Sequence, residues 1–244
     1  MIKISAVSYL NTIPFIDGLR SSSLIDVIDL QLDYPSVCAK KLIKKDVDLA
    51  LVPVVVIPKL ENAHIISDYC IGANGAVDTV CLYSDVPINH IRSITLDYQS
   101  ETSVALLKIL LKEYWMLDPE LKEAKIDFEQ GINGRDAALV IGDRAFSLNK
   151  KHQYIYDLSF IWRDLTGLPF VFAVWVANKE LSEDFILTFN KALQEGLSNI
   201  ENNFYQQEGS YRYCDDIQDY LSNKISYILD ARKLEAMQLF LEKI

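Results

Sequence analysis

Residues 2–53 are IKISAVSYLNTIPFIDGLRSSSLIDVIDLQLDYPSVCAKKLIKKDVDLALVP, a stretch whose apolar pattern changes from strand-like to helical and back. Apolar residues alternate in Ile2–Val7 and again in Ile28–Leu32, which predicts two strands. The intervening Asn11–Leu19 is expected to be a loop that enters a short helix. The run Asp48–Pro53 predicts a third strand, buried on both faces.

Ser36 follows Pro35 directly after the second predicted strand. A serine in this place can cap a helix, whose inward face would include Val37, Leu42 and Ile43. This helix completes the order strand, helix, strand, helix, strand. Such an order is typical of an α/β protein.

A second α/β series follows further along the chain. Its first helix has apolar residues at helical spacing, Ser100 and Thr102 can cap it, and Glu101 favours the positive end of its dipole. A strand is expected at Val77–Ser84, before this series, and short strands of the series itself are expected at Ile94–Leu96, Ile126–Phe128 and Ala138–Ile141.

The last third of the chain predicts one more strand and then helices. Phe170–Val176 is the run FVFAVWV, which is rich in β-branched and aromatic residues. Ser182 is expected to start a long helix that ends near Asn203, and Asp230 to cap a terminal one.

Two of the predicted strands are the best candidates for carrying the chain between two lobes. They are the strand that ends near Ser84 and the strand around Val171–Ala177. We therefore predict a discontinuous first α/β lobe, residues 1–84 and 175–244, and an inserted second one, residues 85–174. A ligand then belongs in the cleft between the lobes.

The charge of the chain argues against nucleic acid as a partner. There are 24 Lys and Arg against 34 Asp and Glu, which gives a net charge of −10. Affinity for nucleic acid is built from clustered basic residues. The most apolar stretch, Leu49–Ile57, is interrupted by Pro53 and is too short to cross a membrane.

Cysteine and histidine usage points to neither a metal nor a disulfide framework. The four cysteines lie far apart without a CxxC pair, and the chain has three histidines. The N-terminus meets Ser8, Tyr9 and Asn11 before an apolar core of a secretory signal is complete. We therefore expect a protein of the cytoplasm, with neither a zinc site nor a disulfide framework.

The segment Val7–Pro14 places hydrogen-bonding side chains at the carboxyl end of the first predicted strand. Open α/β sheets bind ligands at this end of their strands. The polar residues are Ser8, Tyr9, Asn11 and Thr12. The alternative is that Ser8, Asn11 and Thr12 only cap the next helix and satisfy loop backbone.

The segment Ser100–Ser103 offers hydroxyls and free N–H groups at a helix N-terminus, which attracts carboxylates or phosphates. An ordinary capping box is the alternative, and Ser36 has the same two interpretations. No two carboxylates have a spacing that forces them together, and GxSxG, Walker, GxGxxG and HExxH motifs are absent from the sequence. Hydrolase, NTPase and Rossmann dehydrogenase functions therefore have no positive support.

Five segments together resemble the chorismate dehydratases of the futalosine route to menaquinone. They are VSYLNTIPF (7–15), PSVCAKKLIKKDVDLALVPV (35–54), LDYQSETSVALLKILL (96–111), AALVIGDRA (137–145) and TGLPFVFAVW (166–175). The resemblance implies an α/β fold like that of type 2 periplasmic binding proteins, with two lobes around a central cleft. It also implies a lyase that removes water from chorismate, a small dicarboxylate, without a metal or an organic cofactor.

The resemblance also assigns roles to residues. Asn11 matches the family's active-site asparagine, and Thr79 stands where relatives commonly have a serine, so that the hydroxyl is kept. These two are the candidate catalytic residues. The candidate substrate-binding residues are Ser8, Tyr9, Thr12, Ser36, Ser100, Thr102 and Ser103.

Two other functions stay open on the sequence. One is 1,4-dihydroxy-6-naphthoate synthase of the same pathway, although an S-P-C-P-N-D-like motif is expected there in place of Tyr9-Leu10-Asn11-Thr12-Ile13-Pro14. The other is a non-catalytic module that binds a small anion.

Overall fold

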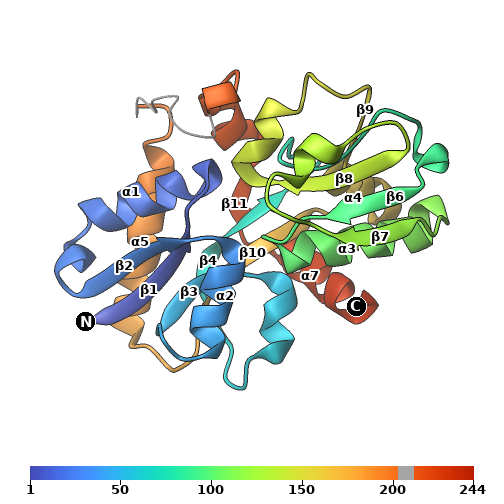
Figure 1. Cartoon of the computed structure of the whole chain (residues 1–244). Helices are drawn as coiled ribbons and strands as arrows, with labels where there is room; N and C mark the ends of the chain where they lie inside the picture. The colour runs from blue at the N-terminus through green and yellow to red at the C-terminus, as the bar shows by residue number, and fades with distance from the viewer. Residues whose placement is uncertain (203–211) are drawn as a thin grey trace.

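The computed structural model describes residues 1–202 and 212–244 and has two mixed β-sheets with helices packed against them (Figure 1). The first sheet has six strands in the order β11-β4-β10-β3-β1-β2. Their bounds are β1 Ile2–Val7, β2 Ile28–Asp33, β3 Leu49–Pro53, β4 His64–Ala73, β10 Phe170–Ala177 and β11 Ser226–Ile228. This arrangement confirms the predicted α/β class.

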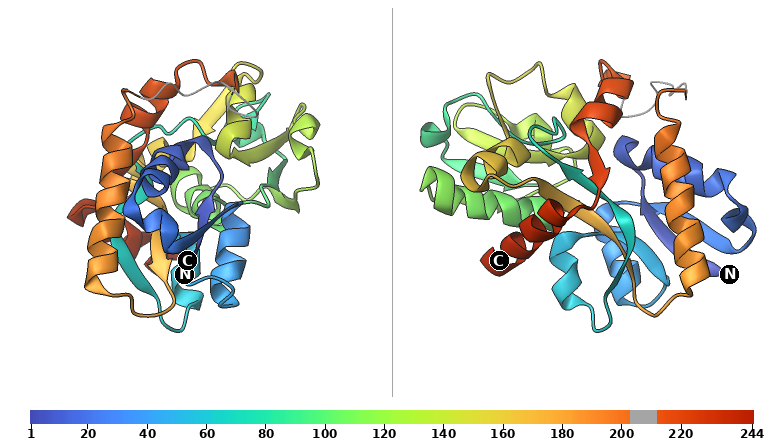
Figure 2. Two further views of the ribbon diagram at one scale, coloured as in Figure 1. Left: turned by 90° about the vertical axis from the view of Figure 1, so that its left-hand side faces the viewer. Right: turned by 180° about the vertical axis from the view of Figure 1, so that it is seen from behind.

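The N-terminal half of the first sheet is parallel. Strand β1 pairs with β2 on one side and with β3 on the other, whereas β10 runs antiparallel to both β3 and β4. The helices after β1 and β2 are α1 (Ile13–Ser21) and α2 (Pro35–Ile43). They lie on opposite faces of the sheet, as Figure 2 shows.

The predicted cap at Ser36 is wrong. Tyr34 is the N-cap of α2, Pro35 is its first residue, and Ser36 lies inside the first turn. Proline fits the first helical position because its fixed φ suits the helix and its missing N–H is not needed there. The helix therefore starts two residues earlier than a Ser36 cap would require.

Helix α1 is held against α5 (Glu183–Ser198) by direct backbone contact. A Cβ atom added to Gly18 would lie 2.0 Å from the carbonyl oxygen of Ala192, and one added to Gly196 would lie 1.9 Å from that of Pro14. The predicted cap Ser182 is confirmed, since its side chain accepts a hydrogen bond from the Phe185 N–H. The predicted end near Asn203, a residue outside the described ones, is too late, because α5 ends at Ser198 and Asn199 is its C-cap.

The second sheet has five strands in the order β7-β6-β8-β5-β9. Strand β6 is parallel to β7 and β8, and β5 is antiparallel to β8 and β9. Helices α3 (Glu101–Leu110) and α4 (Leu158–Thr166) pack against this part of the molecule. The strand bounds are β5 Val80–Ser84, β6 Ser93–Leu96, β7 Glu120–Glu123, β8 Asp136–Ile141 and β9 Tyr154–Asp157.

The strand predicted at Ile126–Phe128 is wrong. Asp127 adopts a left-handed φ of 58°, which interrupts an extended chain, and Phe128 begins a 3₁₀ turn. The edge strand of this region is β7, with the sequence ELKE. Charged residues are common on edge strands because they discourage pairing with another chain, and here they hide the strand from an apolar pattern.

The sheets also correct the predicted lobe boundaries. Strand β5 belongs to the second sheet, although the boundary at residue 84 assigns it to the first lobe. All of β10 belongs to the first sheet, although the boundary at residue 175 divides it. The chain passes between the sheets after Ala73 and again before Phe170, because apolar strands look alike in sequence whichever sheet they join.

The C-terminal segment runs along the junction of the two sheets. It contains α6 (Ile217–Asp219), a π-helical turn (Tyr220–Lys224), β11 and α7 (Ala231–Lys243). Asp230 caps α7, as predicted. Within residues 1–202 and 212–244, no helix combines the length and the apolar character that crossing a bilayer requires.

Candidate active site

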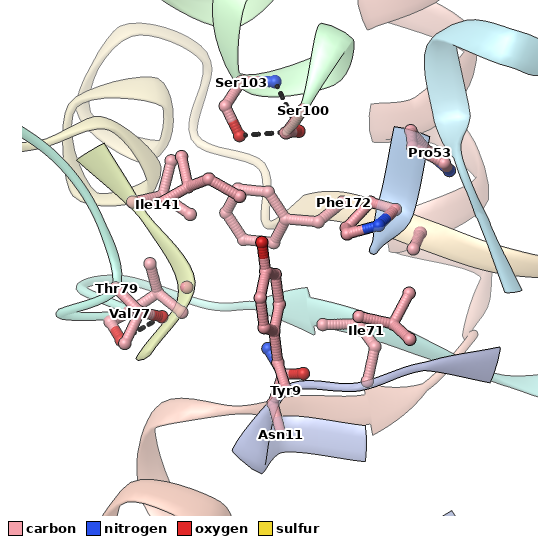
Figure 3. Close-up of a pocket in the computed structure, with 15 residues that line it drawn as sticks. Tyr9, Asn11, Pro53, Ile71, Val77, Thr79, Ser100, Ser103, Ile141 and Phe172 are labelled. Carbon is pink, nitrogen blue, oxygen red and sulfur yellow. Dashed lines mark hydrogen bonds between the residues drawn. The ribbon is translucent and has the colours of Figure 1, made fainter. Parts of the chain in front are cut away.

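A cavity lies between the two sheets, where the carboxyl ends of β1, β3 and β8 face the N-terminus of α3 (Figure 3). The free volume of the cavity is about 50 Å³, whereas pockets for small ligands usually have volumes of about 300–1,000 Å³. A ligand therefore requires the cavity to widen. The lining residues are Val7, Tyr9, Asn11, Pro35, Pro53, Ile71, Val77, Thr79, Val80, Ser100, Ser103, Ile141, Gly142, Phe172 and Ala173.

Tyr9 spans the cavity from the first sheet to the second. Its ring stands among the lining residues, with the hydroxyl end toward Ser100 and Ser103 (Figure 3). The hydroxyl donates a hydrogen bond to Oε1 of Gln99, which follows β6. Burial, with a smaller contribution from the Asp97 carboxylate, raises the pKa of Tyr9 far above its ordinary value. The phenol therefore stays protonated and ties the two sheets together.

Gly142 makes room for the Tyr9 ring. Its φ is +68°, and a Cβ atom built on it would lie 2.7 Å from a ring carbon of Tyr9. Any other residue would be strained in the left-handed region, and its Cβ atom would also clash with the ring. The glycine after β8 therefore permits the position of Tyr9.

Asn11 lies in a short 3₁₀ turn, Leu10–Thr12, directly after β1. The Leu10 N–H donates to both carboxylate oxygens of Asp143, at 3.1 and 3.2 Å. The Thr12 hydroxyl donates to Oδ1 of Asn11 at 3.1 Å, and the Tyr227 hydroxyl donates to the Asn11 carbonyl at 3.0 Å. The turn is thus fixed from three directions.

Thr79 comes from the segment that leads from the first sheet to the second. The N–H groups of Val77 and Asp78 donate to Oδ2 of Asp157, at 2.8 and 2.7 Å, which fixes this segment. The Thr79 hydroxyl lies 2.9 Å from that of Tyr220. Thr79 and Asn11 thus line the same cavity, although they are 68 positions apart in the printed sequence.

The N-terminus of α3 supplies the hydroxyls on the second-sheet side. Ser100 accepts a hydrogen bond from the Ser103 N–H at 3.2 Å, and the two hydroxyl oxygens are 3.1 Å apart. Helix geometry leaves the N–H groups of Glu101 and Thr102 without acceptors in the helix. This end of α3 is therefore suited to a carboxylate.

No charged residue is among the fifteen lining residues, but three charged groups lie just behind them. Arg144 Nη2 is 2.5 Å from Oδ2 of the fully buried Asp97. Asp97 also accepts the N–H groups of Gln99 and Ile141, at 2.8 and 3.1 Å, and so joins the loop before α3 to the end of β8. Burial raises the pKa of the third group, Asp143, to about 7, because only the Leu10 N–H opposes it.

The structure brings five of the nine predicted site residues to the cavity: Tyr9, Asn11, Thr79, Ser100 and Ser103. The other four do not line it. Ser8 is exposed at the end of β1, and Ser36 is half-buried in the first turn of α2. Thr12 and Thr102 are fully buried, and the Thr102 hydroxyl instead accepts the Val55 N–H at 3.3 Å.

The sequence did not predict the apolar walls of the cavity or the groups behind it. Phe172, Ile71 and Ile141 lie in strands, where apolar residues look like ordinary core. Asp143 and Tyr220 have partners at sequence separations of 133 and 141. The one local signal was the Ile141-Gly142-Asp143 sequence, in which a glycine and an acid interrupt a buried run.

Comparisons with known proteins identify the family. A family model described as menaquinone biosynthesis matches residues 2–244. The chain belongs to the menaquinone biosynthesis family. A chorismate dehydratase of Thermus thermophilus is 30% identical over 159 residues, which cover 57% of this chain and 58% of that protein. The match thus spans less than two thirds of the length of the Thermus thermophilus protein.

Solved structures confirm the fold. A protein of Archaeoglobus fulgidus has a TM-score of 0.74 at 14% identity, covering 99% of this chain and 96% of its own. The aliphatic sulphonate binding protein SsuA of Escherichia coli has a TM-score of 0.58 at 15% identity, covering 99% and 90%. A Candida albicans gene product described as having the generic periplasmic binding protein fold has 0.56 at 11%, covering 100% and 80%. This menaquinone biosynthesis protein thus has a periplasmic-binding-protein-like fold.

Among residues 1–202 and 212–244, no three His, Cys, Asp or Glu side chains are grouped so that they could hold a metal ion.

Proposed function

We propose that this protein is a cytoplasmic chorismate dehydratase, which removes water from chorismate and gives 3-[(1-carboxyvinyl)oxy]benzoate for menaquinone biosynthesis. The observation that carries the proposal is the meeting of Asn11, Thr79 and the N-terminus of α3 in one cavity with apolar walls. The family match and the similarity to a Thermus thermophilus chorismate dehydratase support it.

The walls and the polar groups suit the two parts of this substrate. Phe172 and Ile71 offer apolar surface to the ring, and Ser100 and Ser103 offer hydroxyls at a helix N-terminus to a carboxylate. With no charged side chain in the lining, local donors must hold a doubly negative molecule. Preorganised donors of this kind are effective where water is excluded.

The reaction itself is an elimination. Chorismate loses a proton from a ring carbon and its ring hydroxyl as hydroxide, which together make water, and the ring becomes aromatic. We propose that the substrate's own enolpyruvyl carboxylate takes the proton, while Asn11 and Thr79 hold the reacting geometry. Asp143 is a poorer base because it lies behind the lining and accepts the Leu10 N–H.

Substrate entry requires Tyr9 to move. The free volume of about 50 Å³ in the cavity is well below the roughly 300–1,000 Å³ of pockets that hold small ligands. The contact between Tyr9 and Gln99 crosses from one sheet to the other. We propose that this contact breaks when the sheets separate to admit chorismate, and that the Tyr9 ring then borders the bound substrate.

The test is to incubate the pure protein with chorismate. The diene absorbance should fall, and mass spectrometry should find a product lighter by one water. Asn11→Ala should keep its fold by circular dichroism and lose about 100- to 1,000-fold in kcat, as removal of a transition-state donor typically does. Asn62→Ala, in an exposed turn, is the matched control and should behave as the unchanged protein.

The outcomes separate the remaining functions. Tight binding of chorismate without turnover would identify a non-catalytic binding module. Turnover of a cyclic futalosine to 1,4-dihydroxy-6-naphthoate, with chorismate untouched, would identify the other enzyme of the pathway. Near-normal activity of Asn11→Ala would remove Asn11 from the mechanism.

A further inference from the structure

Tyr220 lies directly behind the two candidate catalytic residues. It begins the π-helical turn Tyr220–Lys224, and only 3% of the residue is exposed. Its hydroxyl oxygen is 2.9 Å from the Thr79 hydroxyl. The Asn11 side chain also lies near this hydroxyl and lowers its pKa. One phenol is thus close to both residues, although it is not among the lining residues itself.

Tyr220, Thr79 and Asn11 can share their protons in one arrangement that leaves donors for a ligand. Either hydroxyl of the Tyr220–Thr79 pair can be the donor, and Oδ1 of Asn11 accepts the Thr12 hydroxyl at 3.1 Å. When the Tyr220 hydroxyl donates to Thr79, its oxygen can accept from the Asn11 amide. The Thr79 hydroxyl, which donates to the Val77 carbonyl over a long 3.4 Å in this structure, and an amide proton of Asn11 can then turn to a ligand.

The surroundings of Tyr220 hold this arrangement. The ring of Phe146 packs edge-on against it, with centroids 5.0 Å apart. Burial raises the pKa of Tyr220 far above its ordinary value, and this effect outweighs the opposite contributions of Thr79 and Asn11 to the pKa. The hydroxyl therefore keeps its proton throughout the neutral range. A π-helical turn is an uncommon structure that often occurs at functional sites.

We propose that Tyr220 is a positioning residue, whose hydroxyl orients the Asn11 amide and the Thr79 hydroxyl so that both present donors to the substrate. This inference rests on the proposed function for the reaction that it serves. Tyr220 does not touch the reacting atoms. It acts through the two residues that do, and it comes from a part of the chain that is outside the five segments on which the resemblance rests.

The test is Tyr220→Phe, which removes the hydroxyl and keeps the ring against Phe146. We expect kcat to fall about 10- to 100-fold, because the donors are no longer aligned, and KM to change less than about threefold. The matched control is Tyr83→Phe, since Tyr83 is equally buried and its hydroxyl bonds to Asn149 and not to a lining residue. This control should keep the activity of the unchanged protein.

Two further readouts distinguish positioning from a loss of general structure. Adding Tyr220→Phe to Thr79→Val should lower kcat far less than it does alone, because residues of one network are not additive. In NMR spectra, the side-chain amide of Asn11 should shift and exchange faster in Tyr220→Phe than in Tyr83→Phe. If Tyr220→Phe does not fold, Phe146→Leu loosens the same ring, and a fall of about threefold or more in kcat is expected.

The proposed function and this inference fail in different ways. Unchanged kcat in Tyr220→Phe, or fully additive effects with Thr79→Val, would overturn the positioning role while the unchanged protein still dehydrates chorismate. If the unchanged protein has no activity on chorismate, the proposed function fails. The Asn11 amide signal then decides whether the hydrogen bonds exist, and an unshifted signal in Tyr220→Phe would contradict them.

Discussion

The two turns that carry polar side chains into the cavity are held in opposite ways. The turn at Ser100–Ser103 is stabilised by its own residues, since Ser100 accepts the Ser103 N–H three positions away. The turn at Tyr9–Thr12 is held by Gln99, Asp143 and Tyr227, at sequence separations of 90, 133 and 216. One half of the site can form locally, and the other exists only when both sheets and the C-terminal segment are in place.

The largest expected effect on stability comes from Asp143→Asn, which changes a group that holds the Tyr9–Thr12 turn. Burial raises the Asp143 pKa from its ordinary 3.8 to about 7, so between these values the folded protein holds a proton that the unfolded chain has lost. Stability therefore falls as the pH rises from about 4 to about 7 and then levels. Each tenfold change in proton affinity corresponds to about 1.36 kcal/mol, so the free energy of unfolding falls by about 4 kcal/mol over this pH range.

Asparagine cannot ionise, and its Oδ1 can still accept the Leu10 N–H. We expect Asp143→Asn to match the unchanged protein near pH 4 and to be more stable above pH 7, by urea unfolding across this range. If the free energy of unfolding depended on pH in the same way in both proteins, ionisation of the buried Asp143 carboxyl would not be the cause of the loss.

A smaller effect is expected from Gly142→Ala. The new Cβ would lie 2.7 Å from a carbon of the Tyr9 ring, and the alanine would have to adopt a φ of +68°. Gly134→Ala is the matched control, because its φ is +56° and no atom lies within 4 Å of the added Cβ. Backbone strain alone costs about 1–2 kcal/mol, so thermal unfolding should show this loss for Gly134→Ala and a larger one for Gly142→Ala. Equal losses would mean that Tyr9 moves aside freely.

The smallest effect on stability is expected at the self-stabilised turn. Ser100→Ala removes the cap of α3 and should cost about 1 kcal/mol, as loss of an N-cap usually does. Ser182→Ala removes the equivalent cap of α5, away from the cavity, and should cost about the same. Only Ser100→Ala should also raise KM for chorismate. A KM that rises equally in both variants would contradict a role for Ser100 in binding.

The same contrast explains what the sequence could predict. The caps at Ser100, Ser182 and Asp230 were predictable, because a cap joins groups only two or three residues apart. The strands β1 and β3 were predictable from apolar patterns that need no knowledge of their partners. The catalytic roles of Asn11 and Thr79 came from a resemblance to a family, although the place of Asn11 after the first strand already made it a candidate for binding.

Contacts between distant segments could not be predicted in this way. Nothing near Asp143 in sequence shows that it accepts the Leu10 N–H, and nothing near Tyr220 shows that it faces Thr79. Strand β7 was missed because its charged residues lie at a sheet edge. The assignment of β5 to the second sheet depends on pairing with β8 and β9, which an apolar run does not specify.

The most direct test of the account is a crystal structure of the protein with 3-[(1-carboxyvinyl)oxy]benzoate bound. We predict that the aromatic ring lies between Phe172 and Ile71, with one carboxylate at the Ser100–Ser103 turn and Asn11 within hydrogen-bonding distance of the ligand. The hydrogen bond between Tyr9 and Gln99 should be broken. A product bound elsewhere, with the cavity unchanged and Tyr9 still bonded to Gln99, would contradict the central claim.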